Sequence, residues 1–154
     1  MSDGQIAGVM LQANTGEVSA ALIALADSAN ATVTTFATMM VTDHKAASSN
    51  LVKIVRQDSI TVAGSAVRQM LSAEASRTLS ALISTPPGGF DATYVLSQVT
   101  THTMVLQLLD DQLIPNAQDA SLKTELQSER ATVMNHLTAA QQLLNGSGHA
   151  DRGD

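Results

Sequence analysis

The sequence predicts an all-α protein: a four-helix bundle made of two helical hairpins, with an additional short helix between helices 2 and 4. Two observations predict this fold class. Apolar residues recur every three or four positions along five segments, which is the spacing of one face of a helix. No segment alternates apolar and polar residues with a period of two, as a half-buried strand would.

The first hairpin is predicted from residues 6–27 and 31–57, with Asn30 as the cap or turn residue between them. Along its first helix, four apolar residues recur on one face at helical spacing: Leu11, Val18, Leu22 and Leu25. Its second helix has an unbroken stripe with alternating spacings of four and three: Val33, Ala37, Met40, His44, Ala47, Leu51 and Ile54.

A third, shorter helix is predicted over residues 65–83, and it must end before Thr85-Pro86-Pro87-Gly88-Gly89, because proline and glycine interrupt helices. The second hairpin follows, from residues 91–113 and 119–144. Pro115-Asn116 is expected to end its first helix and Asn145-Gly146 its second. The two stripes are Val95, Val99, His102, Leu106, Leu109 and Leu113, and Leu122, Leu126, Glu129, Val133, His136, Ala140 and Leu143.

The composition agrees with closely packed helices and excludes several kinds of function. The chain has 154 residues and is 44% hydrophobic but only 2% aromatic, so small residues must fill many helix contacts. Its net charge is −6, with 8 basic and 14 acidic residues, whereas nucleic-acid binding needs clustered positive charge. No apolar run approaches the ~18–20 residues of a membrane span. We therefore expect no nucleic-acid partner and no membrane span.

The length corresponds to one domain, expected over residues 1–146 and followed by a flexible polar tail at 147–154. The first residues have neither the basic region nor the apolar stretch of a targeting signal. The absence of cysteine excludes disulfides and thiolate sites and carries no information about the compartment.

Four polar residues lie on or beside these apolar stripes at matching heights. Counted from a turn near residue 29, Glu17 lies roughly 18 Å back along its helix and His44 roughly 22 Å forward. Counted from a turn near residue 116, His102 lies roughly 21 Å back and Glu129 roughly 19 Å forward. We therefore expect these four side chains to share one layer near the middle of the bundle.

This layer is a candidate metal site, and His136 is a further candidate ligand. His136 lies two turns beyond Glu129 and joins the layer only if its helix bends. Imidazole with carboxylate favours zinc, iron or manganese, and bundle cores commonly hold such ligands. A di-iron centre is not expected, because no Glu is followed three residues later by His. The alternative is a polar core in which Thr or carboxylate side chains hydrogen-bond the histidines without metal.

Two neighbours of His44 offer further interpretations. Met40 lies one turn earlier, and histidine with methionine can bind copper or haem, although methionine also fills gaps in cores that lack aromatic residues. Copper and haem are therefore less favoured than zinc, iron or manganese. Asp43 is a candidate to orient the ring of His44 from behind, although adjacent residues on one helix do not face each other.

Four segments together form a recognisable pattern: Gly16-Glu17-Val18, Phe36-Ala37-Thr38-Met39-Met40-Val41-Thr42-Asp43-His44, Phe90-Asp91-Ala92-Thr93-Tyr94 followed by His102, and His136-Leu137-Thr138-Ala139-Ala140. Over about residues 5–144 the chain resembles the bacterial DUF4142 (domain of unknown function 4142) family. The resemblance implies a ferritin-like helical bundle and matches Glu17, His44, His102 and His136 to the polar positions of the family.

The resemblance also implies a location, since members are mostly exported or periplasmic proteins, often described as outer-membrane proteins and without an established activity. Two positions depart from the family pattern. Thr101 stands where members usually have Asp, and Arg130-Ala131 stands where they usually have Leu-Pro. The proline kink that would bring His136 toward the other ligands is therefore not expected, and Glu129 does not belong to the family pattern.

These observations predict an exported, non-catalytic binding module that holds a metal ion or a small ligand at mid-bundle. No serine nucleophile elbow, thiol or phosphate loop is present, so an enzyme is not the first expectation. Two other functions remain open: a structural or protein-interaction bundle with a metal-free polar core, and a mononuclear oxidase or hydrolase. A homo-oligomer is compatible with either.

Overall fold

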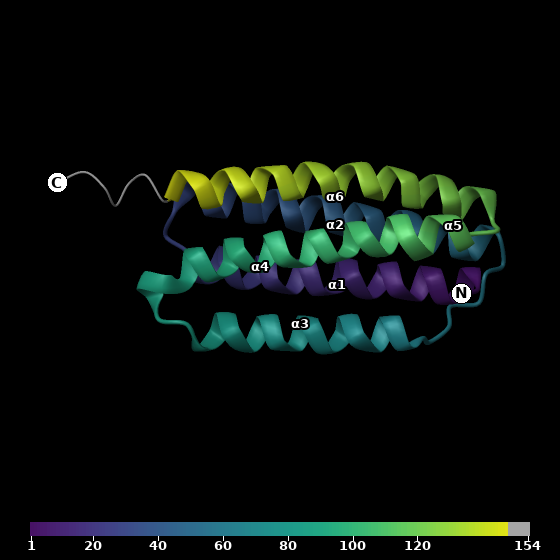
Figure 1. Ribbon diagram of the computed structural model, residues 1–154, viewed down its shortest axis with the longest axis horizontal. Coiled ribbons are helices and arrows are strands. Elements are labelled where there is room, and N and C mark those ends of the chain that lie inside the picture. The colour runs from purple at the N-terminus through teal and green to yellow at the C-terminus, as the bar shows by residue number, and fades with distance from the viewer. Residues whose placement is uncertain (148–154) are drawn as a thin grey trace.

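The computed structural model describes residues 1–147, and within them the chain forms helices and no strand (Figure 1). The all-α prediction is therefore confirmed. The helices are α1 (Asp3–Asp27), α2 (Ala31–Gln57), α3 (Ala66–Ser84), α4 (Pro87–Leu108) and α6 (Ala120–Ser147). Between α4 and α6 the chain passes through a π-helical turn, η1 (Leu109–Leu113), and a short turn, α5 (Ile114–Asn116).

Four of the helices form the bundle, and α3 lies against its edge. α1 packs against α2 and α3, α4 packs against α6, and α2 packs against α6. In Figure 1, α3 lies alongside α1 and carries the chain back along the length of the bundle, so α2 and α4 begin at the same end. The short third helix is thus the connection between the two hairpins.

Side-chain caps fix where the helices begin. Ser2 Oγ accepts a hydrogen bond from Gln5 N and the Gln5 side chain accepts one from Ser2 N, which is a capping box. Asn30 accepts from two amides of the first turn of α2, as the sequence predicts for this residue. Asp119 accepts from Leu122 N (2.8 Å) and holds the first turn of α6.

Four helix ends differ from the sequence prediction by three residues or more, and the first of them is the start of α1 at Asp3 instead of residue 6. α4 begins at Pro87, because proline is tolerated at the first helical position, where its missing N–H is not needed. The helix also continues beyond residue 113, through η1 and α5. The π turn contains Asp111, four residues before Pro115, whose ring would crowd the Asp111 carbonyl in a regular α-helix. α6 continues past Gly146 to Ser147, and the rest of the expected tail, with His149, lies outside the described residues.

Two glycines of α1 allow the loop after α2 to lie directly against this helix. The Gly4 carbonyl accepts a hydrogen bond from Ala63 N (2.9 Å). A Cβ atom at Gly8 would lie 2.5 Å from the Ala63 carbonyl oxygen, closer than any ordinary contact. A Cβ atom at Gly4 would likewise collide with the Thr61 carbonyl oxygen, so the loop needs glycine at both positions to cover the start of α1.

The core consists of two apolar clusters with a polar layer between them. One cluster includes Met10, Leu109 and Leu122, and the other includes Phe36 and Ala140. The polar residues buried between them are Asn14, Glu17, His44, Gln98, His102, Glu129 and His136. The helices therefore bring polar side chains together where a bundle normally places apolar ones.

By length and composition, α1 is apolar enough to cross a membrane, with a mean hydropathy of 1.3 over its most apolar window. It is the one helix of residues 1–147 that meets this criterion, and 44% of that window is buried within the bundle. A core helix meets the same criterion, and α1 directs Asn14 and Glu17 into the interior. The finding is weak evidence for a membrane span.

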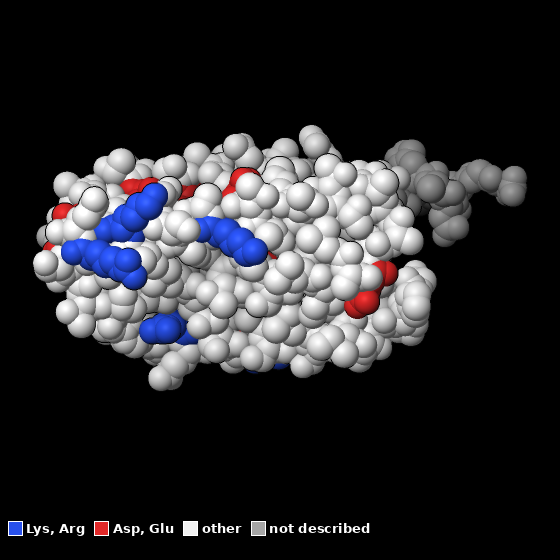
Figure 2. Space-filling model, turned by 180° about the vertical axis from the view of Figure 1, so that it is seen from behind, with Lys and Arg blue, Asp and Glu red and all other residues white. Residues whose placement is uncertain are grey.

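The surface carries few charges. Figure 2 shows one face on which the basic side chains gather toward one end, while much of the remaining area is uncharged. Several large apolar side chains are exposed, and the most exposed is Ile83 at 73%.

Candidate metal centre

Three histidines from three helices converge in the polar layer. His44 of α2, His102 of α4 and His136 of α6 are each at most 5% exposed. The centroids of the His44 and His136 rings are 5.2 Å apart, and the ring of His102 lies 5.7 Å from the first and 5.5 Å from the second. One ring nitrogen from each residue lies within 4.8 Å of the others, so the three could hold a metal ion.

Each ring is oriented through one of its two nitrogens. His44 Nδ1 bonds Asn14 Oδ1 (2.8 Å), His102 Nδ1 bonds the carbonyl oxygen of Gln98 (2.9 Å), and His136 Nε2 bonds Asp43 Oδ2 (2.9 Å). All three partner atoms are acceptors, so in each neutral ring the bonded nitrogen carries the proton. The remaining nitrogens therefore present lone pairs.

Those remaining nitrogens are buried and have no hydrogen-bond partner. They are His44 Nε2, His102 Nε2 and His136 Nδ1. A carboxylate or carbonyl behind a ring, with the opposite nitrogen free, is the usual arrangement around a metal-binding histidine. A satisfied polar core would instead have a partner for these atoms.

Burial keeps these imidazoles neutral, which is the form that binds metal. It lowers the pKa of His44 well below its ordinary value, with a further contribution from the other two histidines. It lowers the pKa of His102 to about 4. It also lowers the pKa of His136, although Asp43 partly opposes the shift.

Two glutamates flank the histidines without joining their group. Glu17 Oε1 lies 3.9 Å from His102 Nδ1, and Glu17 Oε2 has no partner. Burial raises the pKa of Glu17 to about 7, although His136 and the nearby Gln98 amide, which does not reach hydrogen-bonding geometry, oppose the shift. Burial likewise raises the pKa of Glu129 to about 7, opposed by a hydrogen bond from Asn14 Nδ2 to Glu129 Oε2 (3.2 Å).

The structure places His136 in the layer, contrary to the height estimate, without interrupting α6. The estimate centred the second turn near residue 116, but α6 begins only at Ala120. His102 lies fourteen residues before Asn116, and His136 lies sixteen residues after Ala120, so their heights agree. Glu129 lies nearer the turn and reaches His44 only through Asn14.

The two neighbours of His44 have different roles from those considered for them. Asp43 bonds the ring of His136 across the α2–α6 contact, which agrees with the rule that adjacent helical residues do not face each other. Met40 is fully buried in the apolar cluster around Phe36.

Sequence reasoning did not identify two further members of the layer, Asn14 and Gln98, or the buried hydroxyl of Tyr94 in the neighbouring apolar cluster. Asn14 lies one turn before Glu17, and Gln98 lies one turn before His102, so their positions on the inward faces were a usable signal. The Tyr94 hydroxyl is buried without a partner, as are both side-chain polar atoms of Gln98. Burial, together with Glu17, raises the pKa of Tyr94.

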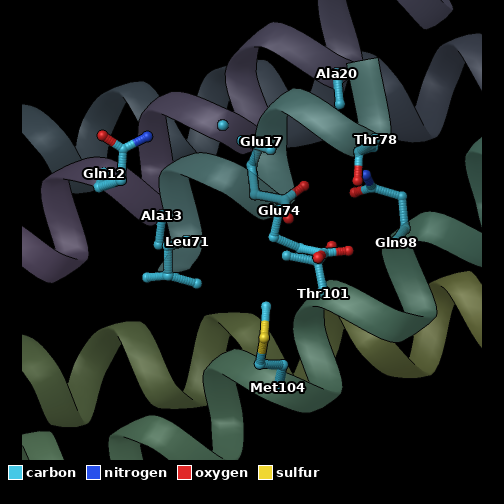
Figure 3. A pocket seen from close by; sticks show the side chains of 12 residues that line it. Gln12, Ala13, Glu17, Ala20, Leu71, Glu74, Thr78, Gln98, Thr101 and Met104 are labelled. Atoms are coloured by element: carbon cyan, nitrogen blue, oxygen red, sulfur yellow. The ribbon is translucent and has the colours of Figure 1, made fainter. Parts of the chain in front are cut away.

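Two openings lead from the surface toward this layer. A pocket of about 350 Å³ lies between α1, α3 and α4, and Figure 3 shows the side chains of Glu17, Glu74 and Gln98 at this pocket. A groove of about 600 Å³ lies between α2 and α6 and reaches Asn14 and His44. Between them, a small cavity borders Glu17, His44 and His102.

Comparison with known proteins identifies the family. The family described as "Domain of unknown function (DUF4142)" matches residues 1–143. No curated protein and no solved structure matches the chain. Because the match covers nearly all of the described helices, the chain belongs to the DUF4142 family.

Proposed function

We propose that this protein is a non-catalytic binding module that holds one divalent transition-metal ion between His44, His102 and His136. The observation that carries the proposal is the difference between the two nitrogens of each imidazole ring. One nitrogen is held by an acceptor, and the other is buried without a partner. Three such lone pairs in one layer are costly to bury unless an ion or a water binds them.

The spacing supports this assignment. In a tetrahedral zinc site with bonds of about 2.05 Å, ligand nitrogens lie roughly 3.3 Å apart. One ring nitrogen from each histidine already lies within 4.8 Å of the others, so a modest movement of the rings would bring three nitrogens to ligand distance. Three imidazoles favour zinc or iron over manganese, which prefers oxygen ligands. Glu17 lies outside this group of three, and its buried, partnerless Oε2 atom makes it a candidate for a fourth ligand after a movement of its side chain.

The proposal also covers the cellular location of the protein and the type of helical bundle to which it belongs. We propose that the protein is exported and acts in the bacterial periplasm or envelope, and that its bundle is of the ferritin-like type. The family resemblance supports both statements. Fractionation of cells that express the natural gene tests the location: we expect the protein with the periplasmic marker, and recovery with the cytoplasmic marker would contradict it.

Metal analysis tests the binding function. Protein purified without a chelator or a metal-affinity step should contain close to one equivalent of metal, measured by elemental analysis. We expect His44→Ala to lose that metal, because it removes one of three ligands. His149→Ala, which removes the remaining histidine of the chain, is the matched control and should retain it.

The polar-core alternative makes a different prediction for the same variants. Wild-type protein would then contain far less than one equivalent of metal, also after incubation with Zn²⁺ or Fe²⁺. His44→Ala would lower the melting temperature to the same extent with and without added metal. That combination would overturn the proposed function.

A further inference from the structure

The groove between α2 and α6 is acidic where it approaches the histidines. Its carboxylates are Asp43, Glu125 and Glu129, and no described Lys or Arg lines it. A concave surface of one charge sign raises the local concentration of ions of the opposite sign. The groove is therefore suited to attract cations.

Glu129 supplies a ligand atom at the inner end of this groove. Its side chain is 4% exposed, and its Oε1 atom is buried without a partner. The other oxygen, Oε2, accepts from Asn14 Nδ2, so the carboxylate is held in place. Asn14 also holds His44, which lines both the groove and the inner cavity, so the groove leads directly to a histidine of the cluster.

The opposite opening, between α1, α3 and α4, is less suited to a cation. Its carboxylates are Glu17, which is buried at the inner end, and Glu74, whose charge at the mouth is partly offset by Arg77 at 2.7 Å. The three carboxylates of the α2–α6 groove have no such Lys or Arg partner among the ion pairs of residues 1–147.

We propose that the α2–α6 groove is the entrance through which a divalent cation reaches the three histidines, and that Glu129 binds the ion transiently on the way. This inference rests on the proposed metal-binding function. An oxygen ligand that is held by one hydrogen bond and free on its second atom can accept the ion from water. The ion then passes to the imidazoles, which bind transition metals more strongly.

Loading and extraction rates of Co²⁺ test the proposal, because bound Co²⁺ absorbs visible light. Chelator-treated full-length protein is mixed with Co²⁺ in a stopped-flow spectrometer, and the loaded protein is then mixed with EDTA. We expect Glu129→Gln to slow both loading and extraction by about tenfold, since the carboxylate acts on the path in both directions. Loss of a resident ligand would instead accelerate extraction.

Three further variants locate the path. Ala47→Leu places bulk in the same groove and should also slow both rates. Thr78→Leu and Glu74→Gln make the matched changes in the α1–α3–α4 pocket and should load at the wild-type rate. Wild-type loading should slow as salt is added, because the groove attracts ions by charge.

The outcomes separate the two proposals. If wild-type protein binds Co²⁺ but Glu129→Gln and Ala47→Leu load at the wild-type rate, the entrance is wrong and the metal site stands. Slow loading of Thr78→Leu alone would place the entrance at the other pocket and overturn this one. Faster extraction from Glu129→Gln would make Glu129 a resident ligand instead. If wild-type protein binds no Co²⁺, Zn²⁺ or Fe²⁺, the metal-binding function itself fails.

Discussion

The Asn14 side chain connects a histidine of the polar layer to a carboxylate of the same layer. Its amide oxygen accepts from His44 Nδ1 and its amide nitrogen donates to Glu129 Oε2. One neutral residue therefore fixes both the tautomer of an imidazole and the orientation of a carboxylate. No other common side chain of this size offers an acceptor and two donors together.

We predict that Asn14→Ala weakens metal binding and destabilises the fold. The change leaves His44 Nδ1 and Glu129 Oε2 buried without a partner, which is worth on the order of 2–4 kcal/mol of unfolding free energy. Loss of an orienting residue also lowers metal affinity by roughly 10–100-fold. Urea unfolding of chelator-treated protein measures the first effect, and calorimetric titration with Zn²⁺ measures the second.

The control is Asn50→Ala, which removes an exposed amide from the same groove. It should change both quantities little. Equal affinity for Zn²⁺ in Asn14→Ala and wild-type protein would show that His44 does not need this hydrogen bond to bind metal.

At the scale of the elements, α1 has a structural and a functional face. One face holds Asn14 and Glu17 in the polar layer, and another carries the glycines against which the loop after α2 lies. Both faces belong to one rigid helix. The loop that covers the start of α1 therefore also helps to fix the position of the Glu17 carboxylate.

Gly8→Ala should therefore destabilise the protein, by about 1–3 kcal/mol, although alanine is the better helix former. The new methyl group would meet the Ala63 carbonyl at 2.5 Å, and a backbone atom cannot move aside as a flexible side chain can. Gly88→Ala in the first turn of α4 is the matched control, since its added Cβ has no neighbour within 4 Å. Thermal unfolding of both variants checks this, and a Gly8→Ala protein as stable as wild type would contradict it.

The sequence predicted the elements better than their ends, for a physical reason. The stripes of α2, α4 and α6 follow from burial, so these helices and the inward direction of His44, His102 and Glu129 could be read directly. The face predicted for α1 was wrong at Leu22 and Leu25, which are 49% and 37% exposed, because the buried face of this helix consists largely of small residues. The turn before Ala120 depends on η1, whose register shift leaves no periodic signal. An error of a few residues there matched the height of Glu129 to that of His102 and put His136 two turns away, whereas His136 is the residue that meets the other two histidines.

At the scale of the whole molecule, the layer places groups with opposite pH dependence between two apolar clusters. The folded protein keeps its buried histidines neutral, with the pKa of His102 near 4. The unfolded chain protonates histidine near pH 6.5, so it binds more protons and stability falls as the pH decreases below that value. The glutamates act in the opposite direction, because their pKa values are near 7 when folded and near 4.5 when unfolded.

Replacement of Glu17 isolates the contribution of this one carboxyl group to the pH dependence of the free energy of unfolding. Above pH 7 the folded chain must bury the Glu17 carboxylate in its charged form, and this lowers stability relative to a neutral side chain. As the pH falls from 7 to 4.5 the folded state takes up a proton that the unfolded state does not bind, and the penalty disappears.

Glu17→Gln should therefore be more stable than wild type at pH 8, by about 3 kcal/mol, and equally stable below pH 4.5. Urea unfolding of chelator-treated proteins across this range measures the difference. Equal stability at pH 8 would show that the carboxylate is not buried in its charged form. In the presence of saturating Zn²⁺ the sign should reverse, because a metal ion stabilises the charged carboxylate that Gln cannot supply.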